Sequence, residues 1–534
     1  MYKQILISIL CVAISAFSSA QSNVYPEEHE LTQLLNPWCM LQNAAGLGVS
    51  PLKTHGITEL GYDKNSGDYH RAQEGNDLSG LNFYSERYDK LGKNWLVWGS
   101  FDFQMNREMN RYFSDVYFPY NSSPYIFGSS VKGNYDKQMF DLHTKFSSVQ
   151  KGKFTYGVGI DYTVADLSRL RDPRSRNYLA DYAAVPAVTF QLSYQITLGL
   201  DGFVRFQKEK MPSTLTVQDD PGLKYYSFFG MENADAVIGA YKGFQRDFES
   251  NFYGGDFQIA ISKNKLNWTT SIGTEYQQQN VFGSIQQSPG SYKSLNYKVL
   301  SVFNLISNNL LINGTLRANY YQGAADELRQ DLITVRDSTT GIASQQWITL
   351  FTYKNRYLTN SYNVDLDLSL RNFLESGKDY AWKVGLKLKS YGFDNRYNMP
   401  YSEMSIDRMT TGVYGQYRIF NHKNHTIRIF SGIDCDFSIK SKLTLSDGAT
   451  TTPTSSSSTI EQGTYDIANQ VILPDFGYYQ DKAFSYKAET DYSFPLTLKK
   501  TTIVGFAKIF FKNTISDHHG SMMNAGVSIG IIPL

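Results

Sequence analysis

The sequence predicts an all-β protein, a transmembrane antiparallel β-barrel of about 18 strands, with 16 to 20 as the tolerated range. Three observations lead to this fold class: an export signal at the N-terminus, many aromatic residues at a negative mean hydropathy, and repeated segments of alternating apolar and polar residues. No segment after the signal approaches the roughly eighteen apolar residues that a spanning helix requires. Strands would therefore have to cross the membrane.

Residues 1–20 resemble a secretory signal peptide. Lys3 supplies a positive start, Ile5 to Ala16 is largely apolar, and Ser18-Ser19-Ala20 provides small residues before Gln21. The apolar stretch is too short for a membrane span, so we expect cleavage before Gln21. The predicted location is the cell outer membrane.

Composition narrows the class of protein further. The chain has 39 Tyr and 33 Phe, which is typical of barrels with aromatic girdles at the two membrane interfaces. Its 51 Lys and Arg nearly balance its 50 Asp and Glu, and without a clustered basic face we expect no nucleic-acid partner. Only Cys39 and Cys435 follow the signal, too few for a disulfide framework. A large secreted β-protein is the alternative that composition leaves open.

Alternation favours the barrel. From Tyr357 to Arg371 one face carries Val364, Leu366 and similar residues, and the other carries Asp365, Asp367 and hydroxyl or amide side chains. One such segment could equally be a half-buried strand of a soluble sandwich, but many in series are typical of a barrel. With Ile57 to Lys64 as the first strand, the count is even and both termini lie on the periplasmic side.

The connections between these segments differ in length. Short links, such as residues 262–265, alternate with long ones, such as residues 209–251. Short periplasmic turns and long extracellular loops are the asymmetry of bacterial barrels. Within the long loops, the hydroxyl-rich stretch Thr450 to Gly463 is expected to be flexible.

Two resemblances add to this interpretation. The block "ITELGYDKNSGDYHRAQEGNDLSGLNFYSERYDKLGKNWLVWGSF", Ile57 to Phe101, resembles the start of an uncharacterised outer-membrane barrel family of Bacteroidota, and "NAGVSIGII", Asn524 to Ile532, is similar to its last strand. That resemblance implies the barrel fold and no site residues. "QNAAGLG", Gln42 to Gly48, is similar to a segment of fatty-acid-transporter-type barrels, which implies an N-terminal segment inside the lumen.

Residues 21–56 therefore form a separate N-terminal segment, and residues 57–534 form the barrel. Glu27 to Leu35 can form one or two helical turns. The segment also contains an apolar group that would not remain in water, which makes it a candidate plug: Leu34, Leu35, Trp38, Met40 and Leu41. The alternatives are docking under the barrel rim and a tail that binds a periplasmic partner.

If the apolar faces meet lipid, the charged residues on the opposite faces line the lumen. The candidate pore-lining set is Asp365, Asp367, Lys383, Lys387, Lys389, Asp434, Asp436, Glu489 and Asp491. The mixed signs predict a hydrated, salt-bridged interior, with a ladder of substrate-binding side chains as the alternative. The short link between two strands also predicts that Asp367 lies opposite Lys383, with a slip of two residues, which would place Asp365 opposite Lys383 or Lys387, as the alternative.

Candidate residues for chemistry are few. His143 faces the lumen without an identifiable nucleophile, and His518-His519 lacks a third metal ligand at a telling spacing. We predict no catalytic residues, no metal site, no cofactor and no enzymatic activity. A loop with Arg169, Arg171, Arg174 and Arg176 either binds anionic lipopolysaccharide or is simply solvated.

The predicted function is that of a channel or transport-related protein of unknown cargo. The alternative is a non-conducting, surface-binding or accessory subunit of an outer-membrane uptake complex. Expected partners are outer-membrane lipid and lipopolysaccharide, together with a small-molecule cargo or an uptake-complex partner.

Overall fold

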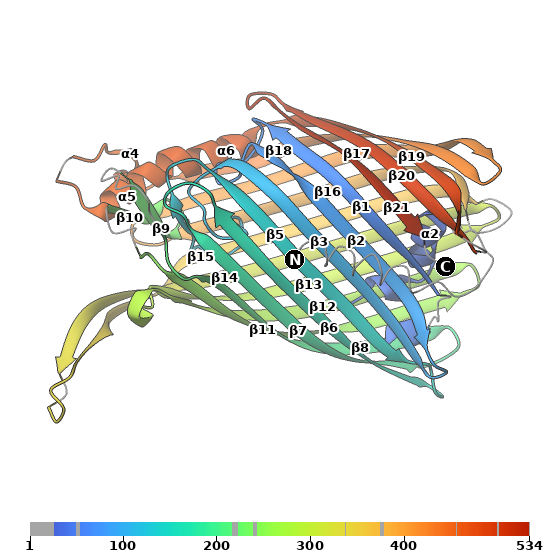
Figure 1. The fold of residues 1–534 in the computed structure, drawn as a ribbon, viewed down its shortest axis with the longest axis horizontal. Helices are drawn as coiled ribbons and strands as arrows, with labels where there is room; N and C mark the ends of the chain where they lie inside the picture. The colour runs from blue at the N-terminus through green and yellow to red at the C-terminus, as the bar shows by residue number, and fades with distance from the viewer. Residues whose placement is uncertain are drawn as a thin grey trace.

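A computed structural model describes residues 26–49, 54–215, 223–238, 243–336, 338–373, 379–454, 456–498 and 501–532. It confirms the predicted fold class. The wall is an 18-stranded antiparallel sheet in which each strand pairs with the next one along the wall. The sheet closes because β21 pairs with β1, from Thr58 opposite Ile531 to Gly67 opposite Met522. Figure 1 shows the tilted strands side by side around the barrel.

The wall strands follow the alternating segments of the sequence, and the first begins at His55 rather than at the predicted Ile57. In chain order they are β1 His55–Gly67, β2 Asp77–Leu91, β3 Trp95–Arg111, β5 Gly133–Ser148, β6 Phe154–Arg169, β7 Arg176–Gln191, β8 Ile196–Met211, β11 Arg246–Lys263, β12 Leu266–Phe282, β13 Gly290–Ser307, β14 Leu310–Arg336, β15 Ala343–Phe373, β16 Tyr380–Tyr397, β17 Ser402–His422, β18 His425–Thr444, β19 Ala483–Leu498, β20 Thr501–Ser516 and β21 Ser521–Ile532.

The wall has an apolar outer face. Large apolar side chains such as Ile160, Val364 and Ile529 remain exposed at alternate positions of their strands. Such a face is stable only in hydrocarbon, which is the physical reason for the period-two pattern in the sequence. Among the described residues, no helix is long and apolar enough to cross a membrane.

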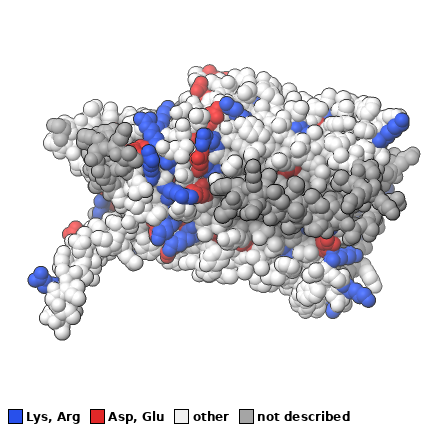
Figure 2. Space-filling model, viewed as in Figure 1, with Lys and Arg blue, Asp and Glu red and all other residues white. Residues whose placement is uncertain are grey.

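Charged side chains mark one edge of the outer face. In Figure 2 the Lys, Arg, Asp and Glu of the visible face gather mainly in a band toward the end that carries the long loops. Exposed ion pairs join neighbouring strands there, including Arg107 with Asp136 at 2.8 Å and Arg176 with Asp166 at 2.6 Å. Charges of this kind belong at the level of the lipid headgroups rather than in hydrocarbon.

The two ends of the barrel differ as predicted. One end has short turns, and we call it the periplasmic end because both ends of the wall sheet lie there. The extracellular end carries a three-stranded sheet and short helices: β4 Phe127–Ser129, β9 Lys224–Gly230, β10 Asn233–Ile238, η2 Ser284–Gln286, α4 Asp447–Thr450, α5 Thr459–Ile467, η3 Ala468–Ile472 and α6 Leu473–Gln480. Strands β14 and β15 continue beyond the barrel as a projecting two-stranded ribbon (Figure 1).

The expectation that Thr450 to Gly463 forms a flexible loop is partly wrong. Residues Thr459 to Gly463 belong to helix α5. Ser458 caps this helix, because its side chain accepts a hydrogen bond from the backbone N–H of Glu461, and the Glu461 side chain accepts one from the N–H of Ser458. This reciprocal capping box starts a helix inside a hydroxyl-rich sequence that otherwise reads as a loop.

The predicted register between β15 and β16 is also wrong. Asp367 lies opposite Lys387, and Lys383 lies opposite Arg371. Phe373 already pairs with Tyr380, so the turn is centred closer to β16 than the link length alone predicts, and the register irregularity between Arg371 and Phe373 shifts the pairing by one further residue. The displacement is an even number of residues, so the predicted inward face is unchanged.

The N-terminal segment lies within the periplasmic end of the barrel. It consists of α2 Pro26–Leu35, η1 Pro37–Met40 and α3 Gly46–Val49. Helix α2 occupies the range in which the sequence predicts helical turns, and Figure 1 shows it behind the strands at the end that carries the C-terminus.

Candidate functional site in the barrel lumen

The N-terminal segment is held by charges on one side of the wall. Glu30 of α2 pairs with Lys383 of β16 at 2.8 Å and with Arg371 of β15 at 2.9 Å. The hydroxyl of Tyr380 donates a third hydrogen bond to the same carboxylate at 2.8 Å. Burial alone would raise the pKa of Glu30, but the charges of Lys383 and Arg371 outweigh it and lower this pKa to about 2. Glu30 is therefore ionised at neutral pH.

A neighbouring face of α2 meets β2. The carboxylate of Glu86 lies 3.2 Å from the ring of His29 and accepts a hydrogen bond from Gln33 at 3.0 Å. The indole of Trp98 also donates a hydrogen bond to this buried carboxylate, at 2.7 Å. One short helix thus connects β2 with β15 and β16, which lie far apart in the order of the wall.

Residues after α2 extend the contact to further strands. The amide of Asn43 donates to Gln258 of β11 at 2.8 Å, and Lys145 of β5 donates to the carbonyl of Leu41 at 2.6 Å. Asn304 of β13 donates to the carbonyl of Leu34 at 2.5 Å. The N-terminal segment therefore contacts strands around much of the circumference, near their periplasmic ends.

The candidate plug residues of the sequence lie in this segment. Trp38 and Leu41 are 4% and 3% exposed, while Leu34, Leu35 and Met40 are half-buried. Trp38 packs so closely on Gly199 of β8 that a Cβ there would come within 2.9 Å of its ring. Sequence reasoning missed the small buried residues that follow, Ala44 and Ala45, because small side chains give no hydrophobic signal.

An apolar core fills part of the extracellular end. Inward-facing wall residues such as Phe248, Tyr292 and Ile406 pack with Phe127 and Tyr225 from the small sheet. Such packing is unusual for a diffusion pore, whose lumen is polar and water-filled. The sequence could not indicate this core, because its residues look like those that face lipid.

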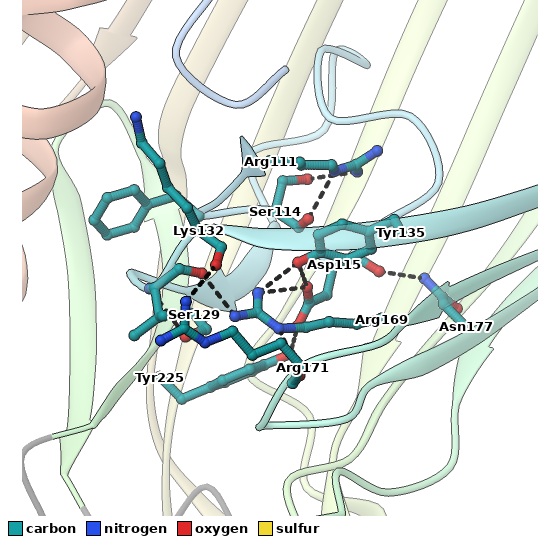
Figure 3. A network of polar contacts seen from close by, with 12 residues as sticks. Arg111, Ser114, Asp115, Ser129, Lys132, Tyr135, Arg169, Arg171, Asn177 and Tyr225 are labelled. Atoms are coloured by element: carbon teal, nitrogen blue, oxygen red, sulfur yellow. Dashed lines mark hydrogen bonds and ion pairs between the residues drawn. The ribbon is translucent and has the colours of Figure 1, made fainter. Parts of the chain in front are cut away.

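A polar network ties the small sheet to the wall (Figure 3). Buried Asp115 accepts hydrogen bonds from the hydroxyls of Tyr135 and Tyr225, both at 2.5 Å, and its carboxylate lies 3.9 Å from Arg169. Arg169 donates to Tyr135 at 2.6 Å and to the carbonyl of Val131. Both expectations for the basic loop are therefore wrong for Arg169, which is buried because this carboxylate and these acceptors surround it.

Three extracellular loops meet at Asp475 of α6. Its buried carboxylate accepts the backbone N–H of Ala72 at 2.7 Å and the hydroxyl of Tyr120 at 2.9 Å. Burial raises the pKa of Asp475 to about 7, against the opposing effect of these two donors and of Arg71. Protonation of Asp475 thus changes near neutral pH, at the contact between the loops β1–β2, β3–β5 and β18–β19.

Two polar cavities lie inside the barrel. A cavity of about 760 Å³ is bounded by wall residues Lys389, Asp434 and Asp436 and by loop residues Arg71 and Glu74. A smaller cavity of about 250 Å³ lies above the N-terminal segment, which contributes Gln42. Its other lining residues include ion pairs of the wall, Arg205 with Asp181 at 2.5 Å and Lys298 with Glu275 at 2.6 Å.

The structure distributes the nine candidate pore-lining charges among different surroundings. Lys389, Asp434 and Asp436 border the larger cavity, and Lys383 holds the N-terminal segment. The remaining five lie on the wall itself: Asp365 opposite Lys389, Asp367 bonded to Tyr414 at 2.7 Å, Lys387 over the Tyr414 ring, Glu489 paired with Lys487 at 2.8 Å, and Asp491 near Gln416 at 3.4 Å.

The three histidines that the sequence singles out, His143, His518 and His519, have carboxylate partners. His143 has Asp161 on Nδ1 at 2.7 Å and Asp141 on Nε2 at 3.0 Å. His518 and His519 both contact Asp481, at 2.8 and 2.6 Å. Within the described ranges, no three His, Cys, Asp or Glu side chains come together as a metal-binding group.

The closed wall with an apolar outer face makes this chain an outer-membrane β-barrel protein. It belongs to a family of unknown function (DUF6850), whose model matches residues 44–532. No curated protein matches the chain significantly.

Several solved structures are similar to the barrel. The copper transporter OprC is 7% identical over 90% of this chain and 80% of its own, with a TM-score of 0.37. The ferric yersiniabactin uptake receptor FyuA from Yersinia pestis is 6% identical over 90% and 80%, with a TM-score of 0.37. The outer membrane transporter YddB from Escherichia coli is 9% identical over 89% and 80%, with a TM-score of 0.36. None of these three is named as a fatty-acid transporter.

Proposed function

We propose that this protein is a gated transport protein of the outer membrane in which the N-terminal segment is a plug. The observation that carries the proposal is that residues 26–49 contact strands on opposite sides of the lumen, through Glu30 on one side and His29 and Gln33 on the other. An 18-stranded wall without such an obstruction lies in the size range that leaves an aqueous channel. The apolar core and the loops at Asp475 narrow the extracellular end.

The lining residues indicate the class of cargo. Both cavities are bordered by charges of both signs, and the larger one also by the unpaired side chains of Lys389, Lys512 and Asp434, which form no ion pair with any described residue. A hydrophilic small molecule would replace water at these groups without losing hydrogen bonds, whereas an apolar one would leave them unsatisfied. We therefore propose a small hydrophilic cargo.

The N-terminal signal and the resemblance to a Bacteroidota family complete the proposal. We infer a cleaved signal peptide at residues 1–20, a plug within residues 21–54 and a barrel whose first strand begins at His55, in a bacterium of that phylum. Residues 1–25 lie outside the described residues. The outer band of ion pairs supports contact with lipopolysaccharide headgroups, and we propose no catalytic role.

Outer-membrane permeability tests the proposal. Cells that produce a variant lacking residues 22–50 behind the intact signal should become sensitive to a bulky hydrophilic antibiotic that the outer membrane normally excludes. The matched control is the Glu489→Ala variant, which changes a lumen carboxylate paired with the wall, and expression is compared through the heat-modifiable folded band. If the truncated barrel folds to the same level and permeability is unchanged, the segment is not a plug.

A second candidate function is surface binding, and the projecting ribbon favours it. Large apolar residues of this ribbon are exposed, among them Ile342, Leu350 and Phe351. An isolated two-stranded ribbon is marginally stable in water, and exposed apolar residues mark interaction sites. Deleting residues 328–353 should leave permeability unchanged if the ribbon serves only partner binding, which separates the two functions.

A further inference from the structure

The larger lumen cavity, of about 760 Å³, lies between the wall and the extracellular loops. Strands β16 to β20 supply part of its boundary, and the loops that carry Arg71, Tyr120 and Tyr478 supply another part. This volume lies within the range of small-molecule sites in proteins. A cargo that enters from the extracellular end would meet this cavity first, so the chemistry of its lining bears on which cargo is accepted.

The ion pairs of the lining leave a positive excess. Arg71 and Glu74 pair with each other at 2.5 Å. The carboxylate of Glu108 is shared by two bases, Arg111 at 3.1 Å and Lys137 at 3.3 Å. One negative charge thus faces two positive charges at this part of the cavity.

Two further lysines of the lining, Lys389 and Lys512, form no ion pair with any residue that the structure describes. Lys512 of β20 lies directly opposite Lys487 of β19, whose charge is already paired with Glu489 at 2.8 Å. Like charges directly opposite each other destabilise an antiparallel pair. A bound anion beside Lys512 would reduce this repulsion.

The carboxylates near these lysines do not cancel the excess. Asp436 is paired with Arg408 at 2.9 Å. Asp365 lies opposite Lys389 in the register without forming an ion pair with it. Among the described residues of the lining, Asp434 is the carboxylate that lacks a cation, against two lysines that lack an anion. The cavity therefore favours a ligand with negative charge.

Neutral hydrogen-bond donors line the same cavity. The hydroxyls of Ser485 and Thr514 share one hydrogen bond at 2.8 Å, which leaves one O–H without an acceptor among the described residues. Tyr69 is 7% exposed, and its hydroxyl has no hydrogen-bond partner. Hydrogen bonds to an ionised acceptor are shorter and stronger than those to a neutral one. A cation accompanied by unused O–H donors suits carboxylate or phosphate oxygens.

We propose that this cavity binds a small molecule that carries a carboxylate or phosphate group, and that Lys512 is the cationic partner of that group. This assignment rests on the proposed function and gives the small hydrophilic cargo a negative charge. An uncharged sugar would fill the same space and use the same hydroxyls, but it would leave the charge of Lys512 unneutralised.

Binding is measured by titration calorimetry on the purified full-length protein, so the test is independent of transport. Glucose 6-phosphate is the phosphate probe, glucuronate is the carboxylate probe, and glucose is the uncharged control of similar size. At least one of the two anionic probes should bind about ten-fold more tightly than glucose, or better, because only these probes form a charge-assisted hydrogen bond with Lys512. The stronger of the two identifies the anionic group.

The Lys512→Gln variant is the decisive comparison. It keeps a hydrogen-bond donor but removes the charge, so the advantage of the anionic probe over glucose should be lost, whereas Lys512→Arg should retain it. Lys508→Gln is the matched control, because Lys508 lies on the same face of β20 but does not line the cavity. The heat-modifiable folded band shows that each variant is folded.

Two results would overturn the proposal. One is that glucose binds as tightly as both anionic probes, and the other is that Lys512→Gln binds the anionic probe as tightly as Lys508→Gln does. Permeability of the variant lacking residues 22–50 tests the plug separately. Either result would therefore remove the anionic class of cargo and leave the plug itself to be judged by that measurement.

Discussion

The ammonium of Lys383 lies 2.8 Å from the carboxylate of Glu30, so a charge of the wall is paired with a charge of the N-terminal segment. Arg371 and Tyr380 complete the set of donors around this carboxylate. Hydrogen bonds to charged groups typically contribute about 1.5–3 kcal/mol each. Glu30 is therefore the residue whose loss should loosen the segment most.

The Glu30→Ala variant should undock the segment while the barrel remains folded. In a Cys435→Ser background, we expect Cys39 to react with maleimide about ten-fold faster or more, since about 1.4 kcal/mol corresponds to a factor of ten. Glu489→Ala serves as the control, because Glu489 pairs with Lys487 of the wall itself. Equal labelling rates in all three proteins would show that the charges around Glu30 do not hold the segment.

The contact between the extracellular loops should weaken as the pH rises. The pKa of Asp475 is about 7 in the folded protein and near its ordinary value of about 3.8 in the unfolded chain, so the folded form retains a proton longer. The stabilisation is complete below about pH 3.8 and is lost as the pH rises through about 7. Limited proteolysis of whole cells should cut the β18–β19 loop faster at pH 8 than at pH 6.

The Asp475→Asn variant isolates this group. The amide that replaces the Asp475 carboxylate in this variant keeps an oxygen that accepts the N–H of Ala72, but it does not titrate. The difference in cleavage rate between pH 6 and pH 8 should therefore disappear. The cleavage rate of a denatured sample at both pH values corrects for the protease itself. A pH difference that survives in Asp475→Asn would place the titrating group elsewhere.

The orientation of the wall predicts opposite effects for neighbouring residues. Val364→Arg places a charge in hydrocarbon, which costs about 2–4 kcal/mol near the midplane, and should abolish stable assembly. Asp365→Arg keeps its charge in the lumen and should be tolerated. The heat-modifiable folded band on gels measures assembly, and an equal loss of this band in both variants would contradict the assignment of the two faces.

The register of β15 and β16 can be tested by crosslinking. Cysteines in place of Asp367 and Lys387, which lie directly opposite each other, should form a disulfide in the folded barrel. Cysteines in place of Asp367 and Lys383 should not. Both pairs need a Cys39→Ser and Cys435→Ser background. A crosslink between positions 367 and 383 would contradict this register and support the pairing that the link length predicts.

The sequence predicts the wall well because one physical requirement acts along all of it. Each strand must present apolar residues such as Val364 to lipid and residues such as Asp365 to the lumen, so the period of two is visible without a structure. The register depends instead on where the turn is centred and on a local irregularity after Arg371, and neither of these leaves such a pattern. The partner of a residue on the neighbouring strand is therefore harder to predict than whether that residue faces lipid or the lumen.

The interior of the barrel was predictable only in part. The apolar group around Trp38 indicates a segment that needs shelter, but its partners on the wall, such as Lys383 and Gln258, come from distant strands. Tyr225 and Phe127 are aromatic, like many residues that face lipid, although they pack inside the lumen. Arg169 likewise reads as a solvated loop residue until Tyr135 and Asp115 are seen around it.

Single-channel conductance tests the central claim, that residues 26–49 obstruct the lumen, most directly. The intact protein, the variant lacking residues 22–50, Asp475→Ala and the combination of both are compared in planar bilayers after each is shown to fold. We expect the intact protein to be nearly silent, the truncated barrel to conduct in stable steps, and the combined variant to give the largest steps. A folded truncated barrel that conducts no more than its untruncated counterpart, in both the native and the Asp475→Ala background, would contradict the account.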